Sequence, residues 1–124
     1  MTDGDTIRVV RDGRREPVRY IGIDTPEAVM PAECFGDAAR SANFELVAGE
    51  RVRLVVGAEA RDRYGRLLAY VYRASDGLFV NAELLRRGYA RVLTIPPNLE
   101  HAREFRALAR ATRRAGRGLW SACR

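Results

Sequence analysis

The chain has 124 residues with 47% hydrophobic and 31% charged side chains, a globular composition that predicts one domain over residues 1–124. Its longest apolar run, Leu67–Tyr72, is far shorter than the stretch of about 18 residues that crosses a bilayer. No basic and apolar leader precedes Asp3. We therefore expect a single domain with no transmembrane helix and no secretory signal within these residues.

The positive charge of the chain comes from arginine alone. All 22 basic residues are arginines, against 16 acidic residues, and the formal net charge is +6. Because a guanidinium group binds phosphate through two parallel hydrogen bonds, this usage favours a polyanionic partner, although a genome rich in G and C would produce the same bias. Residues 101–124 hold seven arginines and one glutamate, which equals the whole net charge. This pattern is typical of a basic helix with either a solvated or a polyanion-binding face.

The first half of the chain alternates between strand and turn patterns. Period-two hydrophobicity and turn spacing predict strands over residues 6–10, 18–23, 51–56 and 67–72. Asp12 and Gly13 predict a hairpin turn between the first two strands. Between the second and third strands, the apolar spacing of residues 37–47 predicts a helix that ends at Gly49.

The second half contains shorter strands and two further helices. A strand is expected over residues 78–80, and Asn81 is expected to cap a helix over residues 82–87. A last strand follows over residues 90–93, and Asn98 is expected to open a helix that reaches about residue 115. Five or so short strands with three helices predict an α+β fold whose strands form a small antiparallel barrel or a strongly curled sheet.

Three carboxylates and two arginines are candidates for chemistry. Asp5 and Asp24 stand at predicted strand ends and Glu27 follows a Thr-Pro turn, while Arg19 and Arg66 lean toward the core. Each has a purely structural explanation, because the acidic segments also fit turns and a buried ion pair would satisfy either arginine. Taken together, however, carboxylate oxygens suit Ca²⁺ or Mg²⁺, and guanidinium groups suit a phosphate.

The relative placement of Arg19 and Asp24 presents a difficulty. Strict alternation across five residues places the two side chains on opposite faces of one strand. A bulge or kink near Gly22 would bring them to the same side.

The order and spacing of these residues resemble one known family. The segments that carry the likeness are Asp3-Gly4-Asp5-Thr6, Arg19 with Asp24-Thr25-Pro26-Glu27, Asp62-Arg63-Tyr64-Gly65-Arg66, Arg87-Gly88-Tyr89-Ala90-Arg91-Val92 and Gly118-Leu119-Trp120. Together they cover the chain from Thr2 to about Ser121 and resemble the staphylococcal nuclease (thermonuclease) family. The resemblance implies a small five-stranded antiparallel OB-type β-barrel with three α-helices. Since only Met1 and Thr2 precede Asp3, the first strand is expected to be truncated.

The resemblance also implies an activity and a metal site. It implies a Ca²⁺-dependent, largely sequence-non-specific endonuclease that cleaves DNA and RNA and leaves 3′-phosphates. Asp5 and Asp24 would bind Ca²⁺ through their carboxylates, and Thr25 through its backbone carbonyl. Glu27 would orient or deprotonate the attacking water.

Contacts with the substrate follow from the same resemblance. Arg19 and Arg66 would hold the scissile phosphate, and Tyr64 would contact the nucleotide. The alternative is a non-catalytic module of the same fold that binds nucleic acid or protein; a more distant one is a basic OB-type binder that stacks bases on its tyrosines. We expect DNA and RNA as substrates, no membrane partner and a monomer.

Cys34 and Cys123 allow two interpretations. They are either buried thiols of a cytoplasmic protein or a disulfide that joins the C-terminal tail to the start of the first predicted helix. In the family, the segment after the last helix returns near the start of the first, which favours the disulfide. We therefore expect an exported protein, secreted or periplasmic, whose leader is absent from this chain.

Overall fold

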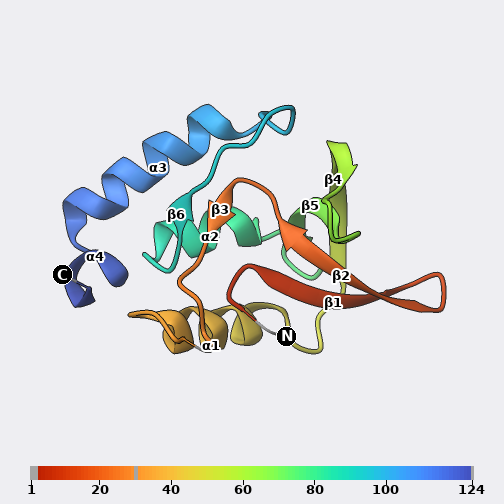
Figure 1. Ribbon diagram of the computed structural model, residues 1–124, viewed down its shortest axis with the longest axis horizontal. Coiled ribbons are helices and arrows are strands. Elements are labelled where there is room, and N and C mark those ends of the chain that lie inside the picture. Colours follow the sequence, from red (N-terminus) through yellow and green to blue (C-terminus); the bar gives the residue numbers. More distant parts are fainter. Residues whose placement is uncertain (1–2, 30, 124) are drawn as a thin grey trace.

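The computed structural model describes residues 3–29 and 31–123, in which most strands come in the first part of the chain and most helices in the second (Figure 1). In chain order the elements are β1 (Thr6–Arg11), β2 (Arg14–Tyr20), β3 (Ile23–Asp24), α1 (Gly36–Val47), β4 (Val52–Arg61), β5 (Leu67–Arg73), α2 (Val80–Arg86), β6 (Arg91–Val92), α3 (Ala102–Ala115) and α4 (Leu119–Ala122). The β1–β2 hairpin forms as predicted, with Asp12 and Gly13 in its turn at φ angles of 52° and 76°. None of the described helices has the length and apolar character needed to cross a bilayer.

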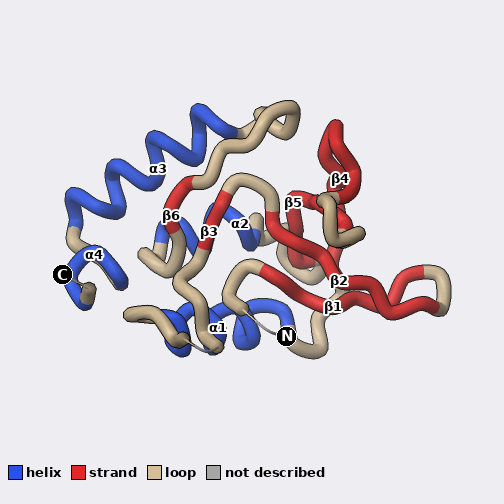
Figure 2. The backbone as a smooth tube through the Cα atoms, viewed as in Figure 1, coloured by secondary structure: helices blue, strands red, loops and turns tan. Residues whose placement is uncertain are grey.

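The strands form two sheets (Figure 2). One has four strands in the order β1-β2-β5-β4, and the other pairs β3 with β6. The expectation of an all-antiparallel arrangement is wrong, because β2 and β5 run parallel; the crossover that a parallel pair requires contains β3, α1 and β4. Within the described residues the strands do not close into a barrel, and there are four helices where three were expected. An OB-type arrangement remains consistent with this topology.

The segment around Asn81 differs from its prediction. Of the strand expected over residues 78–80, a single β-bridge between Phe79 and Tyr72 forms in the described chain, because α2 already begins at Val80 and Asn81 lies inside this helix. The Asn81 side chain is fully buried, where it accepts a hydrogen bond from the Val71 N–H at 2.8 Å and donates one to the Ile21 carbonyl at 2.9 Å. Asn81 therefore does not cap the helix but joins it to β5 and to the turn after β2, because the oxygen and the NH₂ group of a buried amide both need hydrogen-bond partners.

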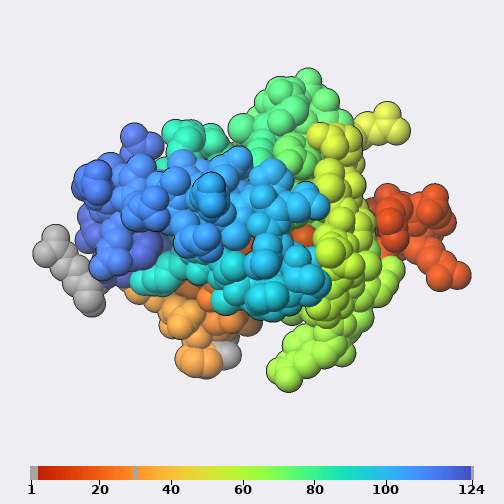
Figure 3. All heavy atoms as spheres, turned by 90° about the horizontal axis from the view of Figure 1, so that it is seen from above, coloured from red at the N-terminus to blue at the C-terminus, as the bar shows by residue number. Residues whose placement is uncertain are grey.

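Asn98 also serves a distant segment. Helix α3 begins at Ala102, so Asn98 lies in the loop before it. Its side-chain oxygen accepts the Glu59 N–H at 2.9 Å and its amide donates to the Glu59 carbonyl at 3.1 Å. In the space-filling view this loop lies against β4 (Figure 3). The contact fixes the loop as one wall of the cleft described below.

One hydrophobic core joins the sheets to three helices. Its buried side chains come from β1, β2, β3 and β5 and from α1, α2 and α3, and the largest of them are Tyr20, Tyr70, Phe105, Ile23, Leu84 and Leu85. A hollow of about 940 Å³ lies between the open edges of β1 and β4, beside the end of α1. None of the candidate site residues lines this hollow.

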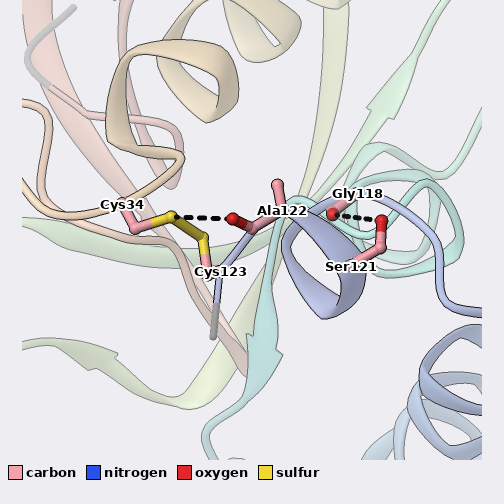
Figure 4. Close-up of a disulfide and its surroundings, with 5 residues drawn as sticks. All are labelled: Cys34, Gly118, Ser121, Ala122 and Cys123. Carbon is pink, nitrogen blue, oxygen red and sulfur yellow. Dashed lines mark hydrogen bonds between the residues drawn. A yellow bond between two sulfur atoms is a disulfide. The ribbon is translucent and has the colours of Figure 1, made fainter.

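A disulfide joins the tail to the segment before α1. The sulfur atoms of Cys34 and Cys123 are bonded, with Cα atoms 5.8 Å apart (Figure 4). Nearby, the backbone of Gly88 meets that of Gly118 so closely that a Cβ on Gly88 would lie 2.3 Å from the Arg117 carbonyl oxygen. The Leu119 N–H donates to the Gly88 carbonyl at 2.8 Å. The tail is thus held by both a covalent bond and a backbone contact.

Reduction of this disulfide is expected to destabilise the domain. The bond closes a loop of 89 residues, for which the chain-entropy model gives an upper figure of about 4–5 kcal/mol. Reductant should lower the melting temperature by about 5 °C or more. A Cys34→Ser/Cys123→Ser variant is the control, because its melting temperature should not respond to reductant. Two reactive thiols in protein purified under oxidising conditions would contradict the bond.

Candidate active site

The site begins at a kink between β2 and β3. Gly22 sits in the turn with φ of +85°, a conformation that favours glycine, and the chain changes direction between Tyr20 and Ile23. This is the kink that the sequence required to bring Arg19 and Asp24 together. The Arg19 Nη2 now lies 3.4 Å from an Asp24 carboxylate oxygen.

Arg19 holds this kink through four contacts. Its Nη1 donates to the carbonyls of Tyr20 at 2.8 Å and Ile23 at 2.9 Å. Its Nη2 faces the carboxylates of Asp5 at 3.3 Å and Asp24 at 3.4 Å. The Arg19 side chain is only 14% exposed, so these partners balance a charge that would be costly to bury alone.

Asp5 links the start of β1 to the segment after β3. The residue is 6% exposed, and its Oδ2 accepts the Thr25 N–H at 2.9 Å while facing Arg19. The Thr25 hydroxyl oxygen is buried and has no hydrogen-bond partner among the described residues. An unsatisfied buried hydroxyl is a position where a further polar group or ion would be stabilised.

The carboxylates around this kink repel one another. Burial, with the nearby charge of Asp5, raises the pKa of Asp24, and Arg19 offsets this rise only in part. The charge of Asp3 raises the pKa of Glu27, with additional contributions from burial, Asp5 and Asp24. An acidic cluster with raised pKa values is one that a bound cation would stabilise.

The donors present fit a hard divalent cation. They are all oxygens, which Ca²⁺ and Mg²⁺ prefer, and histidine and cysteine ligands for zinc are missing from this part of the described chain. In the described ranges no three His, Cys, Asp or Glu side chains form a metal-binding group. Protein ligands would therefore be few, and water or substrate oxygens would complete the coordination.

Arg66 is positioned by the turn between β4 and β5. One oxygen of Asp62 accepts the N–H groups of Tyr64 and Arg66, each at 2.9 Å, and the other lies 2.7 Å from the Arg66 Nε. Burial would raise the pKa of Asp62, but these hydrogen bonds outweigh it and lower the pKa. The Arg66 guanidinium also lies over the Tyr64 ring, 5.4 Å from its centre. Asp62 is thus the anion that meets Arg66.

A cleft of about 380 Å³ brings the two arginines together. Arg19, Tyr64 and Arg66 all line it, and its remaining walls are Tyr20, Ile21, Gly22, Ile23, Glu59, Asp62, Arg63, Leu68, Leu93, Ile95 and Asn98. The predicted carboxylates and Thr25 are not among the lining residues. Arg19 contacts Asp5 and Asp24 directly, and the Thr25 N–H is bonded to Asp5. The cleft has apolar walls and a cationic side that faces the acidic cluster.

Sequence reasoning missed three residues that shape this site. Asp62 entered the sequence analysis only within a segment that resembles the family, with no role assigned, although its side chain fixes Arg66. Asp3 accepts the Ala28 N–H at 3.0 Å and acts on Glu27, and the Asp-x-Asp spacing with Asp5 was the available signal. Arg91 stands opposite Asp24 in the register of β3 with β6, and no local sequence pattern indicates this neighbour.

Comparison with known proteins identifies relatives along nearly the whole chain. The family model described as staphylococcal nuclease homologue matches residues 17–122. "Endonuclease YncB" of Bacillus subtilis (strain 168) is 40% identical over 124 residues, covering 96% of this chain and 58% of the relative. "Thermonuclease" of Staphylococcus intermedius is 44% identical over 99 residues, covering 77% of this chain and 58% of the relative.

A third relative aligns over more of its own length. "Thermonuclease" of Staphylococcus hyicus is 33% identical over 122 residues, covering 96% of this chain and 71% of the relative. The chain spans a little over half the length of the first two relatives, at 58% each.

Gly22 is expected to be intolerant of any side chain. A Cβ there would lie 2.7 Å from the ring of Phe105 in α3, in addition to the strain at positive φ. Gly13, at φ of +76° with no atom within 4 Å of the same position, supplies the matched control. Gly22→Ala should cost about 1–3 kcal/mol more of unfolding free energy than Gly13→Ala, as measured by urea denaturation. Equal losses in the two variants would show that Phe105 moves away freely.

Proposed function

The chain belongs to the staphylococcal nuclease family, and from this membership and the geometry of its site we propose that it is an endonuclease that hydrolyses phosphodiester bonds of DNA and RNA with little sequence preference. The observation that carries the proposal is that Arg19 and Arg66 line one cleft and that Arg19 also contacts the carboxylates of the acidic cluster. Phosphodiester hydrolysis needs that combination, because charge develops on the phosphate oxygens as water attacks.

Ca²⁺ is the proposed cofactor. Asp5 and Asp24 would hold it through their carboxylates and Thr25 through its backbone carbonyl. When bound, the ion would supply electrostatic stabilisation of the phosphate and lower the pKa of a bound water. Ca²⁺ is preferred to Zn²⁺ because every available ligand is an oxygen. A cation bound there would also relieve the repulsion between the carboxylates of Asp5 and Asp24, which supports the same assignment.

Arg19 and Arg66 would grip the scissile phosphate. Asp62 fixes the Nε side of Arg66, which leaves the outer part of a 31% exposed side chain available to a phosphate oxygen. Tyr64 is 69% exposed beside Arg66 and would contact the sugar or base. The apolar part of the cleft would accept the rest of the nucleotide.

Glu27 would act on the attacking water. It would orient the water or accept its proton while the water oxygen bonds to phosphorus and the bond from phosphorus to the 5′-oxygen breaks. The leaving 5′-oxygen takes up a proton, and the phosphate stays on the 3′ side.

An exported protein is the proposed setting. The disulfide between Cys34 and Cys123 supports it, because disulfides persist in oxidising compartments.

Cleavage should require Ca²⁺. We expect single-stranded DNA and RNA to be cut in Ca²⁺ and not in excess chelator, with fragments that a polymerase extends only after phosphatase treatment. Asp24→Asn should reduce the rate on the order of 10²- to 10³-fold. Asp12→Asn, at an exposed hairpin turn, is the matched control and should keep full activity. Binding without turnover would instead support the non-catalytic alternative, and equal cleavage in chelator would refute the metal requirement.

Arg66→Lys should be nearly as damaging as Arg66→Ala. An ammonium keeps the charge but cannot bind Asp62 through one N–H while the outer N–H groups meet a phosphate edge, so each variant should lose on the order of 10²-fold or more in kcat. Melting curves of both variants serve as the folding control. A lysine variant with near-normal turnover would show that Arg66 acts only as the partner of Asp62.

A further inference from the structure

One face of α3 carries a continuous row of arginines. Its members, together with the residue just past the helix, are Arg103, Arg106, Arg110, Arg113, Arg114 and Arg117, and all six are exposed. The spacing of three and four residues places them on one side of the helix. At a rise of about 1.5 Å per residue, this arginine row is about 21 Å long.

Apart from the contact of Arg113 with Trp120, no packing or ion-pair role in the domain is shown for the arginine row among the described residues. The buried residues of α3 are Phe105 and Thr112, with Leu108 and Ala109 packed beside the core. None of the six arginines pairs with a carboxylate in the part of the chain that the structure describes, whereas Arg73, Arg86 and others elsewhere do. Arg113 and Arg114 stand in the last turn, where positive charge stabilises a helix, but like charges along the rest of the face destabilise it slightly, so stability does not explain the whole row.

A stack of side chains connects this row to the candidate active site. The guanidinium groups of Arg113 and Arg91 each lie 5.1 Å from the centre of the Trp120 ring. Arg91 is directly opposite Asp24 in the β3–β6 pair, so the two side chains emerge on the same side. Figure 1 shows β6 between α3 and β3. Arg91, Trp120 and Arg113 therefore form a chain of contacts that leads from the acidic cluster to α3.

We infer that the arginine row is a second phosphate-binding surface, which holds a nucleic-acid strand that continues from the cleft past Arg91. The inference rests on the proposed nuclease function and extends it. The row is long enough to meet several successive phosphates of a single strand, and a protein that neutralises phosphates gains affinity by releasing counterions. The row binds without regard to sequence, and a short oligonucleotide confined to the cleft does not reach it.

The test compares two triple variants that remove the same charge. Arg106→Gln/Arg110→Gln/Arg114→Gln changes the row and leaves the Arg113–Trp120 contact in place. Arg14→Gln/Arg15→Gln/Arg40→Gln changes three exposed arginines of the β1–β2 hairpin and α1. Binding of fluorescent single-stranded DNA of two lengths, one of a few nucleotides and one several times longer, is measured by anisotropy in chelator across a salt series.

The expected result is a loss specific to the row and to the long strand. Three lost phosphate contacts should reduce the slope of log affinity against log salt by about 2, and affinity at moderate salt on the order of tenfold or more. The control variant and the short strand should show little change. Equal losses in both variants, or a row variant with the parental slope, would overturn the inference.

Two further measurements distinguish this inference from the nuclease proposal on which it rests and from binding of a lipid surface. Because binding is measured in chelator, a protein that binds through the row but cuts nothing in Ca²⁺ would refute the nuclease proposal and leave the surface intact. Vesicles of phosphatidylserine and phosphatidylcholine provide the second arm. If the row variant lost affinity for these vesicles but not for DNA, the row would be a lipid-binding surface and the inference would fail.

Discussion

The guanidinium of Arg19 is the group on which both the fold and the site depend. It closes the kink at Gly22 by binding two carbonyls, and it neutralises Asp5 and Asp24 from one side. A cation that drew the two carboxylates toward itself would weaken their hold on Arg19 and leave its charge free for a phosphate. Metal and substrate would then stabilise each other through one shared side chain, which makes their binding interdependent.

Local patterns predicted the local structure well. The β1–β2 hairpin, α1 and β5 follow from alternation, helical spacing and the turn at Asp12, all of which act within a few residues. The parallel pairing of β2 with β5 did not follow, because strand order depends on packing between distant segments. Asn81 and Asn98 were misassigned for the same reason, since each satisfies its amide on backbone far away in sequence.

The site was predictable to the extent that its residues lie in recognisable segments. Strict alternation would place Arg19 and Asp24 on opposite faces of a strand, whereas a shared site needs both side chains on one side. A kink near Gly22 was therefore expected, and the structure has that kink. By contrast, the contribution of Arg91 depends on the pairing of two-residue strands, which carry almost no periodic signal. The two arginines of the cleft come from β2 and from the turn before β5, and only the parallel pairing places them side by side.

The disulfide makes most of the chain a covalent ring. A protease that cut one exposed loop between residues 34 and 123 would leave both fragments attached, whereas a cut between Glu27 and Cys34 would release the segment that carries Asp5, Arg19, Asp24 and Glu27. Fragments that stay linked keep a high effective concentration and reassociate readily. The acidic half of the site is therefore its proteolytically vulnerable half, while Arg66, Tyr64 and α3 survive a single nick in place.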